Sequence, residues 1–82
     1  MTIDEIKNTV LRILGGIAPE ADLTLIKPQV SFREQLDIDS MDFLNFAIGL
    51  SKELGVEVPE ADYPKVASLD GCVEYVMERH AR

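Results

Sequence analysis

The sequence has few of the residues on which several common protein classes depend. It holds one cysteine, one histidine and no tryptophan in 82 residues. One cysteine cannot close a disulfide within the chain, which is typical of a reducing compartment, and we predict a cytoplasmic protein. No apolar run approaches the roughly 20 residues that cross a bilayer, so no membrane insertion is expected. Asp4 and Glu5 also interrupt the stretch in which a secretory signal would be apolar.

Basic residues are scarce as well, with 8 Lys and Arg against 15 Asp and Glu and a formal net charge of −7. The segment 34–62 holds eight acidic residues and one basic residue, so eight minus one accounts for the whole excess. Without a basic stripe, binding to nucleic acid is excluded. An acidic surface instead favours protein partners with basic surfaces.

The length and the 46% hydrophobic content predict one globular domain that spans residues 1–82. Thr2 followed by Glu5 is a capping-box signature for a first helix. Gly15 and Gly16 are predicted to end it. Its apolar face is predicted from residues spaced three and four apart, namely Ile3, Ile6, Val10, Ile13 and Leu14.

The clearest predicted helix covers residues 40–54, with Asp39 as its N-cap and Gly55 as its stop. Apolar residues on this helix form two stripes. The residues of the stripe predicted to face the core are Phe43, Phe46, Ala47, Leu50 and Leu54. Those of the second stripe, beside it, are Met41, Leu44 and Ile48.

The remaining segments predict shorter elements. A long connection, on which Pro19 and Pro28 exclude a continuous helix, contains one short turn over residues 31–36. Residues 60–66 form at most one helical turn because Pro64 lies among them, and Ser68 caps a last helix. The inner face of that helix is predicted to hold Leu69, Cys72, Val73, Val76 and Met77. We therefore predict an all-α bundle of three main helices plus a short third turn, with a long loop between the first two main helices.

The sequence of the segment 37–42 excludes two kinds of site, a calcium-binding loop and a nucleophilic serine. A calcium loop that began at Asp37 would need glycine and glutamate where the chain has Asp42 and Ile48. A nucleophilic Ser40 would need a nearby base, and the only histidine is His80, close to the C-terminus. No catalytic or metal-binding residue is predicted, and Ser40 alone would be a helix-capping serine.

The run Asp39-Ser40-Met41-Asp42 resembles the Asp-Ser-Leu/Met motif of acyl carrier proteins. The segments 32–36 and 54–59 and the last helix agree with that family in spacing. The resemblance implies that a separate phosphopantetheinyl transferase attaches 4′-phosphopantetheine from coenzyme A to Ser40. The arm's thiol then carries an acyl group as a thioester, and the protein itself is not an enzyme. In that family, the residue that matches Asp39 helps to hold the magnesium of the transferase.

The resemblance also implies two further sets of residues. Partner enzymes, such as acyl-loading, ketosynthase or acyltransferase enzymes with basic surfaces, would dock on Met41, Asp42, Leu44 and Ile48. The acyl chain would be sequestered among residues that a plain core explains equally well. These are Phe32, Leu36, Phe46, Leu50, Val66, Leu69, Cys72 and Val76.

The sequence departs from carriers of fatty acid synthesis at Asn45, Ser51 and Lys52, where those usually have glutamates along the helix. It therefore resembles a specialised carrier, and we expect a monomer. Phe43 and Phe46 are bulkier than the residues common at their positions, which would either reduce the room for an acyl chain or reshape the pocket. A peptidyl or D-alanyl carrier and a carrier-like interaction module that never receives the arm remain open.

Overall fold

The structure is a computed structural model that describes residues 2–80, with every side chain among them except that of His80. Its four α-helices are α1 (Ile3–Ile17), α2 (Phe32–Gln35), α3 (Ser40–Leu54) and α4 (Leu69–His80). Two 3-10 helices, η1 (Leu23–Leu25) and η2 (Glu60–Val66), lie between them. The described chain holds no strand, which confirms the all-α prediction. None of its helices is long and apolar enough to span a bilayer.

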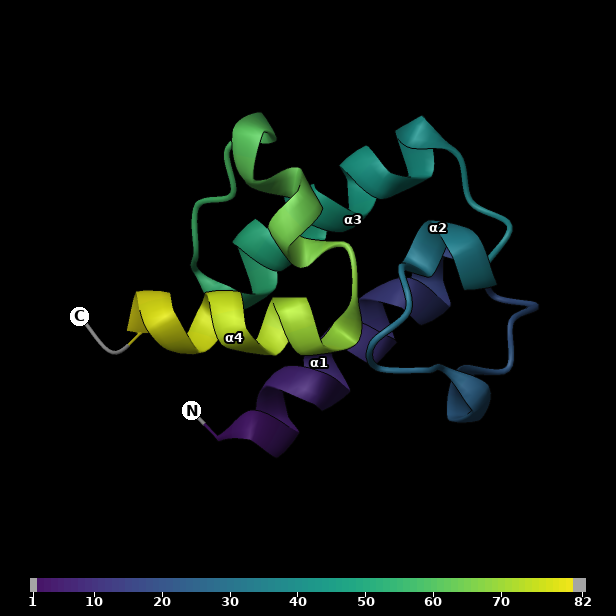
Figure 1. The fold of residues 1–82 in the computed structure, drawn as a ribbon, viewed down its shortest axis with the longest axis horizontal. Coiled ribbons are helices and arrows are strands. Elements are labelled where there is room, and N and C mark those ends of the chain that lie inside the picture. Colours follow the sequence, from purple (N-terminus) through teal and green to yellow (C-terminus); the bar gives the residue numbers. More distant parts are fainter. Residues whose placement is uncertain (1, 81–82) are drawn as a thin grey trace.

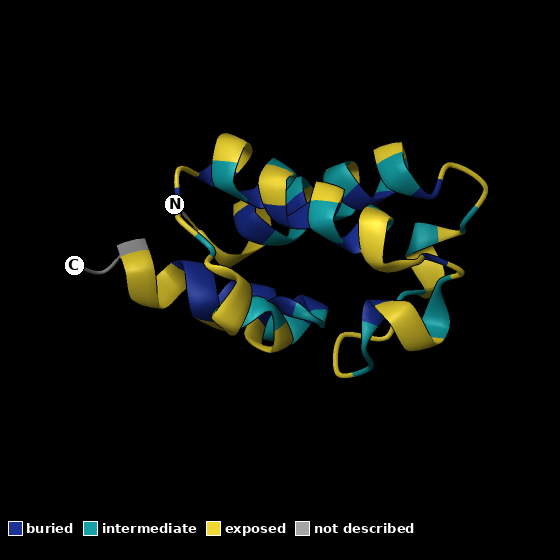
Figure 2. Cartoon of the chain, turned by 90° about the horizontal axis from the view of Figure 1, so that it is seen from above, coloured by how far each residue is buried: buried dark blue, intermediate teal, exposed yellow. Residues whose placement is uncertain are grey.

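The helices form a bundle in which α1 packs against both α3 and α4, and η2 packs against α4 (Figure 1). Buried residues line the inner sides of the helices and exposed residues the outer sides (Figure 2). All five residues predicted to face the core from α3 are buried. On α1, Ile6, Val10 and Leu14 are buried as predicted, whereas Ile3 is 47% exposed.

The predicted helix starts are confirmed by capping hydrogen bonds. The Thr2 hydroxyl accepts from the Glu5 N–H at 3.2 Å, and the Glu5 carboxylate accepts from the Thr2 N–H at 3.2 Å. Ser68 accepts from the Gly71 N–H at 3.1 Å at the start of α4. Gly55 ends α3 in the left-handed region, with φ 65°, which costs glycine little because it has no Cβ.

The predicted end of the first helix was wrong, because α1 continues through Gly15 and Gly16 to Ile17. Glycine lowers helix stability but does not forbid a helix that packing supports. The helix stops at Ala18, whose φ of −126° and ψ of 70° are non-helical. Ala18 precedes Pro19, and the proline ring disfavours the helical region for the residue before it.

Two predictions nearer the C-terminus were also wrong. The segment η2 has seven residues rather than at most one turn, since the fixed φ of Pro64 suits a 3-10 helix. Met77 is 37% exposed, and Tyr75 is buried on α4 in its place. The Tyr75 hydroxyl donates to Asp62 at 2.7 Å, which holds the ring against η2.

The long connection between α1 and α3 is fixed onto the bundle. The Gln35 amide accepts from the Lys27 N–H at 2.8 Å and donates to the Val30 carbonyl at 2.9 Å, which closes the loop on itself. The Phe32 N–H donates to the Ala67 carbonyl at 2.7 Å, next to the start of α4. These bonds place α2 close to the first turn of α3 (Figure 1).

Candidate functional site

Ser40 is the first residue of α3 and is exposed. Its neighbours form a capping box, in which the Asp39 carboxylate accepts from the Asp42 N–H at 2.9 Å and the Asp42 carboxylate accepts from the Asp39 N–H at 3.2 Å. The predicted N-cap role of Asp39 is therefore confirmed. The two carboxylates that flank Ser40 are held in fixed positions, whereas its hydroxyl makes no hydrogen bond within the described chain.

The surroundings of Ser40 offer no means to activate its hydroxyl as a nucleophile. No basic side chain bonds it, and no three His, Cys, Asp or Glu side chains among the described residues gather closely enough to hold a metal. An unactivated hydroxyl is a poor nucleophile. Within the described residues, the chain therefore supplies Ser40 with neither a base nor a metal site.

A groove with a volume of about 550 Å³ opens beside Ser40, where α2, α3 and η2 meet. Most of its lining is apolar or aromatic, and Arg33 and Glu60 add one charge of each sign. The Phe43 ring contacts Tyr63 edge to face at 5.6 Å and also contacts Phe46, at 5.8 Å, in the core. The apolar and aromatic residues of the lining are Met41, Phe43, Leu44, Tyr63, Pro64 and Ala67.

The predicted docking residues are accessible on the outer side of α3. Met41 is 63% exposed and Ile48 is 47% exposed, while Asp42 and Leu44 are half-buried. Met41 and Leu44 lie at the groove beside Ser40, and Ile48 lies further along the same helix. Exposed apolar side chains next to carboxylates are common in interaction surfaces. Their role in docking stays a prediction.

The residues predicted to line an acyl pocket all belong to the core or pack against it. Leu36 is half-buried and the other seven are buried. Phe32 and Phe46 pack edge to face at 5.2 Å, and the Cys72 thiol donates to the Val66 carbonyl at 3.3 Å. Burial raises the pKa of Cys72 to about 12, so the thiol is un-ionised near neutral pH. The use of these residues as a pocket stays a prediction.

The sequence did not predict five residues of the groove, namely Arg33, Glu60, Tyr63, Pro64 and Ala67. They come from α2, from η2 and from the C-cap of η2, and only the fold brings them beside Ser40. One signal was available for Arg33, because it is the last basic residue before the acidic segment 34–62.

Comparison with known proteins identifies the chain as a carrier domain. Residues 4–76 match the family model described as "Phosphopantetheine attachment site". An acyl carrier protein of Nitratidesulfovibrio vulgaris is 30% identical over 80 residues, which cover 96% of this chain and 99% of that protein. One from Rubrobacter xylanophilus is 33% identical over 57 residues, 70% of each chain. The chain belongs to the acyl carrier protein family.

The fold agrees with that of a solved relative. The structure of an acyl carrier protein from Enterococcus faecalis, described for its high thermal stability, superposes with a TM-score of 0.79. The superposition covers 95% of this chain and 98% of the Enterococcus chain, at 23% sequence identity. Members of the family carry groups on covalently attached phosphopantetheine and interact with partner enzymes, rather than acting as catalysts.

The residues beside Ser40 fit a phosphopantetheine group. The serine hydroxyl is accessible and unbonded, and the groove next to it offers an apolar surface for the arm. The attached group supplies a thiol that holds the cargo as a thioester. Ser40 would hold the group, and the groove would offer it an apolar surface.

Proposed function

We propose that Ser40 is the attachment point and that this protein presents acyl thioesters to enzymes of fatty acid, lipid or polyketide-type synthesis. The observation that carries this proposal is the position of Ser40 within the matched region. It is exposed, free of hydrogen bonds and beside the groove. The proposed role is that of a carrier rather than a catalyst, as in the family to which the chain belongs.

Asp39 is proposed to supply one ligand to the magnesium of the phosphopantetheinyl transferase. Its carboxylate sits next to Ser40 and uses one oxygen, Oδ1, to cap α3. Carboxylate oxygen is a ligand that Mg²⁺ prefers, and the ion usually takes only one or two protein carboxylates together with phosphate oxygens.

The partners are proposed to be acyl-loading, ketosynthase or acyltransferase enzymes with basic surfaces. The carrier itself is proposed to be a monomer in the cytoplasm. Support comes from the formal net charge of −7 and from the exposed apolar residues Met41 and Ile48 on α3. Charge complementarity accelerates the encounter, and the apolar contacts then contribute affinity. The acidic residues flank α3 more than they line it, which supports a specialised carrier.

The attachment is tested by intact mass spectrometry after incubation with a phosphopantetheinyl transferase, Mg²⁺ and coenzyme A. The wild type should gain the mass of one phosphopantetheine group, and Ser40→Ala should gain nothing. Ser51→Ala, which removes another hydroxyl from the same helix, is the matched control and should be modified normally. A gain that survives Ser40→Ala would refute the site, and no gain with several broad-specificity transferases would favour the unmodified interaction module.

The role of Asp39 is tested in the same assay with Asp39→Asn. Asparagine caps a helix about as well as aspartate, so the melting temperature should change little. Loss of the carboxylate should slow modification by at least about tenfold, because a charged ligand to the magnesium is lost. An Asp39→Asn chain modified at the wild-type rate would show that Asp39 is only an N-cap.

A cargo assay separates acyl from aminoacyl carriage. The modified chain should be loaded by acyl-transferring enzymes and should not be loaded by adenylation enzymes that activate amino acids. Loading by the second group alone would identify a peptidyl or D-alanyl carrier.

A further inference from the structure

Among the described residues, Arg33 is the one cation that lines the groove beside Ser40. It is exposed on α2, and its guanidinium makes no hydrogen bond or ion pair within the described chain. The other two arginines with described side chains are both paired. Arg12 bonds Glu53 at 2.7 Å, and Arg79 bonds Asp62 at 3.0 Å. Arg33 is therefore an arginine without a partner at the place where the arm would be attached.

The surroundings of Ser40 are otherwise negative. Asp39 and Asp42 flank the serine, and Glu60 lines the same groove. At the N-terminus of α3 the Asp42 N–H already donates to the Asp39 carboxylate, so this helix end offers the partial charges of the Ser40 and Met41 N–H groups but no full positive charge. A phosphodiester on Ser40 would add a further negative charge to this site. Within the groove, only Arg33 offers a positive charge to meet it.

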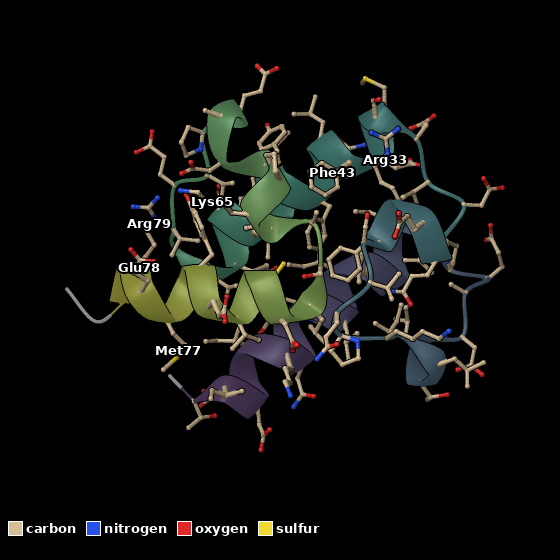
Figure 3. All side chains as sticks on the ribbon, viewed as in Figure 1. Arg33, Phe43, Lys65, Met77, Glu78 and Arg79 are labelled. Carbon is tan, nitrogen blue, oxygen red and sulfur yellow. The ribbon has the colours of Figure 1, made fainter. Side chains whose placement is uncertain are left out.

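The position and chemistry of Arg33 suit that role. In Figure 3 its guanidinium lies near the first turn of α3, and Arg33 lines the same groove as Ser40 and Met41. A guanidinium stays charged at all physiological pH values and presents a planar fork of N–H donors that matches two phosphate oxygens. Hydrogen bonds between Phe32 and Ala67 and between Gln35 and Lys27 fix α2, so the stem of Arg33 starts from a defined position.

We propose that Arg33 binds the phosphodiester of the arm on Ser40 and thereby holds the start of the arm in the groove, against Phe43 and Tyr63. Arg33 is a positioning residue, because it does not take part in thioester chemistry. The inference rests on the proposed attachment at Ser40. It goes further by assigning a role to a residue outside the Asp-Ser-Met motif.

The test compares the unmodified and modified protein by NMR and by thermal unfolding, after intact mass has shown that Ser40 is fully modified. The side-chain Nε–Hε signal of Arg33, assigned by its loss in Arg33→Gln, should shift on modification. The signal of Arg12, which is paired at the other end of α3, should stay in place. At low salt, we compare the melting temperature of each chain before and after modification. The change should be about 1 to 5 °C less favourable in Arg33→Gln than in the wild type.

Two variants make the comparison specific. Lys52→Gln removes the same charge from the far end of α3, and modification should change its melting temperature as in the wild type. Arg33→Lys keeps the charge but not the fork, and it should restore part of the stability difference. The difference should disappear in high salt, because exposed charges are screened.

The outcomes separate this proposal from the one on which it rests. If Ser40 is not modified, the attachment proposal fails first. If Ser40 is modified but the Arg33 signal stays in place, and Arg33→Gln behaves like Lys52→Gln, the role of Arg33 is refuted while the attachment stands. If the Arg33 signal of the wild type stays in place on modification, and Arg33→Gln slows modification without changing stability, Arg33 contacts the transferase instead, which also refutes the proposal.

Discussion

Cys72 should react with thiol reagents at least about a thousandfold more slowly than an ordinary cysteine, so the thiol of the arm can be titrated separately from it. The side chain is 0% exposed, and its thiol donates to the Val66 carbonyl. Burial raises its pKa to about 12. At about pH 8 such a thiol is ionised in about one molecule in ten thousand, whereas a thiol with a pKa of about 8.5 is ionised in about one in four. Ionisation alone therefore slows Cys72 by about 2,000-fold, before any steric protection.

The assay is colorimetric titration of thiols with an aromatic disulfide reagent. The folded, unmodified chain should show no fast-reacting thiol, and the modified chain should show one, from the arm. Unfolding in concentrated guanidinium chloride should add one more to each, because the chain has a single cysteine. Cys72→Ala is the control and should keep the arm's signal while losing the one released by unfolding. Fast reaction of the folded, unmodified chain would refute the burial of Cys72 on the inner face of α4.

Two further predictions concern the surface and the packing. Leu44→Glu should weaken the binding of partner enzymes by at least about tenfold and leave the helical CD spectrum intact. Asn45→Glu adds the same charge at the neighbouring exposed position and should have less effect. A loss of helicity in Leu44→Glu would show that Leu44 belongs to the core. Gly71→Ala should lower the free energy of unfolding by about 1 to 3 kcal/mol, since the new Cβ would overlap the Lys65 carbonyl oxygen. Gly16→Ala, whose Cβ would meet nothing within 4 Å, should raise it by about 0.5 to 1 kcal/mol. Urea unfolding measures both, and equal effects would refute a close approach at Gly71.

The faces and caps of α3 were predictable from sequence because they depend on local rules. Its core stripe follows from helical periodicity, the N-cap from the side chain of Asp39, and the stop from the left-handed residue Gly55. The end of α1 was predicted wrongly because Gly16 is compatible with a helix that packing supports, whereas the local signal that ends the helix is Pro19, which disfavours the helical region at Ala18. The burial of Tyr75 in place of Met77 on α4 was also not predicted, because Tyr75 is held by a hydrogen bond to Asp62 on η2.

The groove is a tertiary feature and has no local signature. Its lining combines Arg33 from α2, Phe43 from α3 and Tyr63 from η2, residues that lie ten and twenty positions apart. Each of them, taken alone in the sequence, has an ordinary explanation as a surface cation or a core aromatic. Ser40 could be singled out because its motif is contiguous, whereas the surface against which its arm would lie could not.

A cargo has two predicted places, the groove beside Ser40 and the core, and the length of the acyl group should decide between them. Entry into the core must separate Phe32 from Phe46, whose edge-to-face contact alone is worth about 0.5 to 1.5 kcal/mol, and must open neighbouring contacts. The groove beside Ser40 is already open, so a cargo there displaces only water from Phe43 and Tyr63. Each methylene buried in an apolar interior gains about 0.8 kcal/mol, so one or two methylenes offset one aromatic contact and several are needed to offset a wider opening. Short acyl groups should therefore lie in the groove, and only longer chains can gain enough from the core to open it.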